Sequence, residues 1–143
     1  MQNFSFWKTH PPKMIELLRF ILRYGSPLLE KHRFEITDSK NSPEESNIHL
    51  RNLHTSILLS QKRGELPIIE FQSLYQKNKE KWHQLHHIST ILKRPTQERR
   101  LNDANTAFFL THIDAIIKLF SPENKDKTLQ KLAELQNTNN KKS

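Results

Sequence analysis

The chain has 143 residues, a formal net charge of +8, two glycines and no cysteine. This length suits one domain with its own core, and the missing cysteine excludes disulfides, cysteine-ligated zinc and thiol nucleophiles. Two glycines are too few for a phosphate-binding loop or for many tight β-turns. Since no apolar run is long enough to span a membrane, we expect a cytoplasmic protein, with a periplasmic or secreted one still open if a signal peptide was removed.

The first predicted helix is the stretch KMIELLRFILRY, which follows Pro11 and Pro12 and ends before Gly25. Its polar residues Glu16, Arg19 and Arg23 are spaced three and four apart and share one face. Apolar residues cover most of the remaining surface. A helix with so narrow a polar stripe is expected to lie in the core or to dock a partner.

Three Ser-Pro pairs, at 26–27, 42–43 and 121–122, are typical of helix starts, with a hydroxyl cap followed by proline in the first turn. Ser42 and Glu45 form the pattern of a capping box, which predicts a helix from there to about Arg63, ended by Gly64. Leu50, Leu53 and Ile57 would supply its buried stripe.

Three further helices are predicted at about 67–92, 96–120 and 122–135, the first two separated by Pro95. The segment 67–92 carries apolar residues at alternating intervals of three and four. Residues 35–42 would form a long loop, and residues 137–143 a disordered tail. The predicted fold is therefore all-α, a single-domain bundle of four to five helices over residues 1–136.

The stretch KEKWHQLHH, residues 79–87, raises the question of a metal site. On a helix, Trp82 and Leu85 would face the core, so His83 and His87 would point to solvent one turn apart. Such a pair can bind zinc, but neighbouring Lys79 would repel the ion. We predict no metal site and no cofactor.

Seven lysines and arginines against two glutamates give residues 77–100 a net charge of +5. Such a stretch is typical of a surface that contacts phosphates, and it predicts a non-enzymatic module that binds nucleic acid or another polyanion. The histidines would add charge below about pH 6.5. The predicted nucleic-acid-binding residues are Lys77, Lys79, Lys81, His83, His87, Lys93, Arg94, Arg99 and Arg100.

The alternative is a protein–protein adaptor, or a protein that forms homo-oligomers. It is based on the apolar first helix and on Phe4, Phe6 and Trp7, which would bind the partner. The stretch LFSPENKDKTLQKL, about a tenth of the chain, is similar to helix openings of Spy-like bacterial periplasmic helical proteins. It departs from them at Asn124 and is explained by ordinary capping, but it keeps a chaperone-like role among the alternatives.

Two other patterns are weaker. The stretch IELLRFILRYGSPLLEKHRF could form a helix–turn–helix that presents Lys31, His32 and Arg33, although its second helix would be short. His112 and Asp114 lie on one predicted helix, without the nucleophile, base and acid that nucleophilic catalysis requires. We therefore predict no catalytic residues and no enzymatic activity.

Overall fold

The computed structural model describes residues 14–94 and 99–142, with side chains from 16 to 94 and from 99 to 137. It contains a five-stranded antiparallel sheet as well as helices, so the predicted all-α bundle is wrong. In chain order the elements are α1 (Met14–Tyr24), the π-type turn η1 (Pro27–Lys31), β1 (Glu35–Asn41), β2 (Glu45–Arg51), β3 (Thr55–Lys62), β4 (Ile68–Ser73), β5 (His83–Gln84), α2 (Leu85–Ile91), α3 (Asp103–Leu119) and α4 (Lys125–Lys142).

The sheet is a meander in which each strand pairs with the next in the order β1-β2-β3-β4-β5. Along β3, Thr55, Ile57 and Leu59 are buried while the residues between them are half-buried, and β2 alternates in the same way. This period of two is the period of a strand with one face in the core. The segment predicted as a helix from residue 42 to residue 63 is therefore a β-hairpin together with the turn before it.

The capping-box residues close the turn between β1 and β2. The amide of Glu45 donates to Ser42 Oγ at 3.1 Å, and the Ser42 hydroxyl donates to the carbonyl of Glu45 at 3.0 Å. A side-chain oxygen that accepts from the amide three residues later serves a helix start and a turn equally well. Gly64, with φ of +77°, lies in the turn between β3 and β4 rather than at a helix end.

The predicted helix at 67–92 is divided into β4, a loop, β5 and α2. The β4 sequence IIEFQS is rich in the β-branched and aromatic residues that suit a pleated surface. The first predicted helix is present as α1, and the fourth as α3. The last predicted helix is α4, which continues to Lys142, through residues for which we expected no order.

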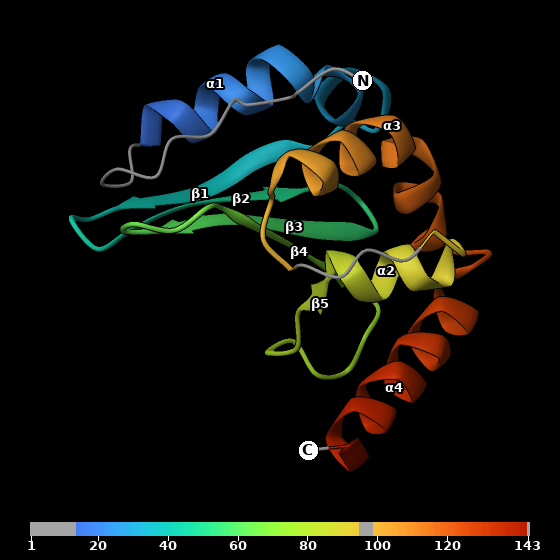
Figure 1. Cartoon of the computed structure of the whole chain (residues 1–143). Helices are drawn as coiled ribbons and strands as arrows, with labels where there is room; N and C mark the ends of the chain where they lie inside the picture. The colour runs from blue at the N-terminus through green and yellow to red at the C-terminus, as the bar shows by residue number, and fades with distance from the viewer. Residues whose placement is uncertain (1–13, 95–98, 143) are drawn as a thin grey trace.

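Helices α1 and α3 cover one face of the sheet (Figure 1). Phe71 of β4 is fully buried there, with its ring 6.2 Å from the ring of Phe109 in α3 and 6.2 Å from that of Phe120, just beyond α3. From α1, Leu17 and Phe20 are also buried. Helix α2 follows β5, and α4 extends away from the sheet (Figure 1).

Replacing Phe71 with alanine tests this core. Because the ring is fully buried between two other rings, we expect the free energy of unfolding to fall by about 3–5 kcal/mol, from lost burial and from the cavity left behind. Urea unfolding followed by circular dichroism measures it. The control is Leu22→Ala, at a side chain that is 67% exposed on α1, where we expect a change within about 0.5 kcal/mol. Equal losses in the two variants would contradict the assigned core.

Candidate functional site

The structure distributes the lysines and arginines among the predicted nucleic-acid-binding residues over three segments. Lys77, Lys79 and Lys81 are exposed in the loop between β4 and β5. Lys93 and Arg94 are exposed just beyond α2. Arg99 and Arg100 come after residues 95–98 in the sequence and shortly before α3. Arg100 is half-buried and pairs with Glu65 at 3.3 Å, so part of its charge is balanced within the chain.

His83 and His87 are buried, in β5 and α2, and do not point away from the core as the helical interpretation required. His83 Nε2 lies 3.1 Å from Gln76 Oε1. Burial, and then the nearby charges of Lys81 and His87, lower the pKa of His83 to about 4. Burial and the charge of His86 lower the pKa of His87 as well. Both side chains are therefore neutral at pH 7 in the folded chain.

Phe4, Phe6 and Trp7, the predicted partner-binding residues, lie outside the described residues. In the described ranges no three histidine, aspartate or glutamate side chains are grouped so that they could hold a metal ion. None of the helices in those ranges has the length and apolar character needed to cross a membrane.

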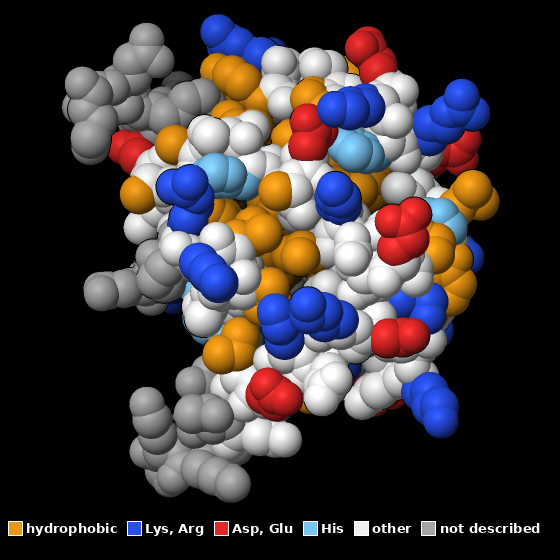
Figure 2. All heavy atoms as spheres, turned by 90° about the vertical axis from the view of Figure 1, so that its right-hand side faces the viewer, with side chains coloured by type: hydrophobic (Ala, Val, Ile, Leu, Met, Phe, Trp, Pro, Cys, Tyr) orange, Lys and Arg blue, Asp and Glu red, His pale blue; other side chains and the backbone are white. Residues whose placement is uncertain are grey.

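A groove between α2, α3 and α4 gathers lysines that sequence spacing does not group. It consists of two adjoining pockets of about 300 and 410 Å³ that share Ile91 and Lys131. Figure 2 shows hydrophobic side chains in a hollow on this side of the molecule, with lysine and arginine side chains around them. We call it the lysine-rimmed groove; its apolar residues are Ile91, Leu92, Ala115, Leu119 and Leu135, and its lysines are Lys93, Lys118, Lys127 and Lys131.

Two local structures hold the rim in place. Thr128 Oγ1 donates to the carbonyl of Leu119 at 2.6 Å, and Leu132 is fully buried, so the first half of α4 is fixed against the end of α3. At the end of α2, Lys93 has φ of +61°, and the amides of Lys93 and Arg94 donate to the carbonyls of Thr90 and Ser89. That pair of bonds is a Schellman motif, in which the residue at the Lys93 position turns left-handed.

A second hollow lies between the end of η1 with the two residues after it, the turn between β2 and β3, and the second half of α3. Its volume is about 530 Å³. We call it the histidine cavity; it is lined by Lys31, His32, Arg33, Asn52, Leu53, His54, Thr55, Asp114, Ile117, Lys118 and Ser121. Lys118 lines both this cavity and the lysine-rimmed groove.

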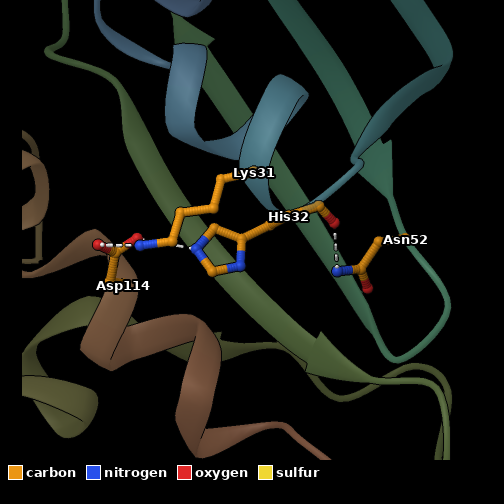
Figure 3. A network of polar contacts seen from close by, with 4 residues as sticks. All are labelled: Lys31, His32, Asn52 and Asp114. Carbon is orange, nitrogen blue, oxygen red and sulfur yellow. Dashed lines mark hydrogen bonds and ion pairs between the residues drawn. The ribbon is translucent and has the colours of Figure 1, made fainter.

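One carboxylate organises one wall of the cavity (Figure 3). Asp114 Oδ1 lies 2.8 Å from His32 Nε2, and Asp114 Oδ2 accepts from Lys31 Nζ at 3.0 Å. These hydrogen bonds, from His32 and then Lys31, lower the pKa of Asp114. An ionised carboxylate can only accept, so His32 Nε2 carries a proton.

The opposite wall is the turn between β2 and β3. Asn52 Oδ1 accepts from the amides of His54 and Thr55, at 2.9 and 2.8 Å, and Asn52 Nδ2 donates to the carbonyl of His32 at 3.0 Å (Figure 3). One amide side chain thus closes the turn and attaches it to the segment after η1. His54 Nδ1 lies 2.6 Å from the hydroxyl of Tyr75, and the two rings stack.

Sequence analysis did not predict this cavity. The sequence indicated only a weak helix–turn–helix pattern for Lys31, His32 and Arg33. It placed Asp114 on the same predicted helix as His112 and gave it no role. His32 and Asp114 are 82 positions apart, and no short motif joins residues at that distance. A fold is needed before the pair can be recognised.

Comparison of the chain with protein-family models, with curated proteins and with solved structures finds no match.

The buried His83 predicts a pH dependence of stability. Its imidazole stays neutral in the folded chain down to about pH 4 but takes up a proton near pH 6.5 when unfolded. Since the unfolded chain binds more protons in that interval, the free energy of unfolding should fall as the pH drops, by about 1 kcal/mol between pH 7 and pH 5.5 from this group alone.

Urea unfolding at the two pH values measures that loss in the unmodified chain and in His83→Gln. We expect the variant to lose clearly less stability on acidification. The control is His112→Gln, a change at a half-buried histidine of α3, which should keep the full dependence. An unchanged slope in His83→Gln would show that His83 is not held neutral.

Proposed function

We propose that this protein is a non-enzymatic binding module, and that the lysine-rimmed groove takes up an acidic amphipathic helix of a protein partner. The observation that carries the proposal is the combination of an apolar floor with a rim of lysines from three separate segments. An apolar stripe along the partner helix would lie on the floor, and its acidic residues would face the rim.

The geometry of α4 supports this arrangement. Lys127 and Lys131 are four residues apart, so they lie on the same side of the helix and form one edge of the groove. Lys118, in the last turn of α3, and Lys93, beyond α2, stand on other parts of the edge. Among the described side chains that line the groove, Glu134 carries the one negative charge. A basic rim of this kind speeds encounter with acidic partners and disfavours basic ones.

Nucleic acid is the second candidate, and a different observation favours it. The exposed lysines and arginines between residues 77 and 99, together with the formal net charge of +8, would contact phosphates without any apolar floor. The burial of His83 and His87 removes two of the residues assigned to that surface. An acidic helix makes use of both the rim and the floor, and for that reason we place it first.

The test measures binding of a designed peptide by fluorescence anisotropy. The peptide is helical, with leucine at every third or fourth position and glutamate on the opposite face; a control peptide has the same composition in scrambled order. We expect the patterned peptide to bind more tightly. Lys127→Glu with Lys131→Glu should weaken its binding at least tenfold, because two attractive contacts become repulsive.

The matched control is Lys77→Glu with Lys81→Glu, an equal change of charge at exposed lysines of the β4–β5 loop. It should leave peptide binding nearly unchanged. If the scrambled peptide binds equally well, binding depends on net charge alone, and that result would contradict the proposed role of the groove. Salt-dependent binding of duplex DNA that the control pair abolishes, with no peptide binding, would establish the second candidate instead.

A further inference from the structure

We propose that the histidine cavity is a second, separate binding site, which takes a small organic phosphate, a phosphomonoester with an apolar body. The lysine-rimmed groove is not needed for this inference, although the two hollows share Lys118. Four features of the cavity carry it: its size, its balance of charge, its two histidine rings and an unpartnered hydroxyl.

The size and the walls suit a small organic molecule. A volume of about 530 Å³ lies within the range of ligand pockets, which combine apolar walls with a few polar groups that fix orientation. Ile117 of α3 is buried and lines the cavity, and Leu53, 84% exposed in the turn between β2 and β3, lines it as well. These two side chains would hold the apolar body of the ligand.

The charge of the cavity favours a dianion. Lys31, Arg33 and Lys118 line it together with one carboxylate, that of Asp114, so these four side chains carry a net charge of +2. The carboxylate already accepts from Lys31 and His32, so part of its negative charge is balanced locally. A phosphomonoester carries a charge of about −1.5 to −2 at neutral pH, whereas a carboxylate carries one charge and would leave the cavity positive.

The histidines leave one nitrogen each for a ligand. His32 uses Nε2 toward Asp114, and His54 uses Nδ1 toward Tyr75. Within the described residues, His32 Nδ1 and His54 Nε2 have no hydrogen-bond partner. Asp114 also fixes the orientation of the His32 ring (Figure 3).

Thr55 supplies an independent sign that a ligand atom belongs here. Its side chain lines the cavity and is 1% exposed, and its hydroxyl makes no hydrogen bond with any described residue. A buried hydroxyl without a partner is uncommon in native structures. If the side chain turns toward the cavity, an oxygen of a ligand there would give the hydroxyl a partner.

Arg33 offers a clean test because of its backbone. Its φ is +56°, in the left-handed region where glycine is unstrained and arginine is not. Arg33→Gly therefore removes a cation from the cavity without straining the fold. Lys93→Gly is the matched control: it also removes a cation at a residue with positive φ, +61°, but Lys93 lies at the end of α2 and does not line the cavity.

The probe is phenyl phosphate, measured by calorimetry with the full chain, and benzoate and inorganic phosphate are compared with it. We expect saturable binding of phenyl phosphate, at least tenfold tighter than that of benzoate. Arg33→Gly should weaken it about tenfold, because a charge-assisted hydrogen bond is lost, and Lys93→Gly should not. Thr55→Val, which keeps the shape of the side chain, should weaken binding without lowering the melting temperature.

Three results would overturn the proposal. One is the absence of saturable binding of phenyl phosphate to the folded chain. The second is an equal loss of affinity in Arg33→Gly and Lys93→Gly, which would mean that only net charge matters. The third is benzoate binding as tightly as phenyl phosphate, which would make the cavity a carboxylate site. If inorganic phosphate competes with phenyl phosphate, the assignment of the headgroup is supported.

Discussion

The packing of Phe71 against Phe109 and Phe120 is the contact on which both hollows depend. Phe109 lies in the first half of α3 and Phe120 just after its end, so the two contacts fix α3 over the sheet at two points along its length. Helix α3 contributes Asp114 and Ile117 to the histidine cavity, and Ala115 and Leu119 to the lysine-rimmed groove. The core thus fixes the position of α3, and with it the residues that α3 contributes to the cavity and to the groove.

Asn52 has a comparable role on a smaller scale. Its amide accepts from two backbone amides of the β2–β3 turn and donates to the carbonyl of His32, so it satisfies three backbone groups of segments twenty residues apart. Each such bond adds about 1 kcal/mol, and leaving a half-buried backbone group without its partner costs more. The exposed ion pair between Lys31 and Asp114 contributes little to stability by comparison, and its effect is on orientation.

The amino-acid sequence allowed the prediction of α1 and α3, whose proline and glycine boundaries and apolar faces leave little choice. The sheet was missed for two physical reasons. First, the spacing of Leu50, Leu53 and Ile57 fits the buried stripe of a helix, but the buried residues Ile48, Leu50, Ile57 and Leu59 fit the alternation of two strands equally well. Leu53 belongs only to the helical pattern, and it is exposed in the structure. The scarcity of glycine also misled, because Ser42 and Asn52 close their turns with side-chain oxygens and need no glycine.

The candidate sites were harder to predict than the fold, for a different reason. A cluster such as residues 77–100 is visible because its charges lie within one short stretch of sequence. The groove instead draws its lysines from positions 93, 118, 127 and 131, and the cavity draws its residues from 31 to 121. The packing of α2, α3 and α4 brings the lysines of the groove together, and the packing of α3 beside η1 and the β2–β3 turn brings the residues of the cavity together. Even the burial of His83 and His87 follows from the strand and short helix that contain them, not from their spacing.

Helix ends explain part of the positive charge on this side of the molecule. Lys31 lies in the last turn of η1, Lys118 in the last turn of α3 and Lys93 just beyond α2, where a cation is favourable to the negative end of the helix dipole. Stability alone could therefore favour lysines there, and their presence does not by itself indicate a ligand. What stability does not explain is the apolar floor left open between three helices, and the buried Thr55 hydroxyl beside two histidines. Those two features, more than the number of positive charges, indicate a binding surface and not merely a surface rich in lysine.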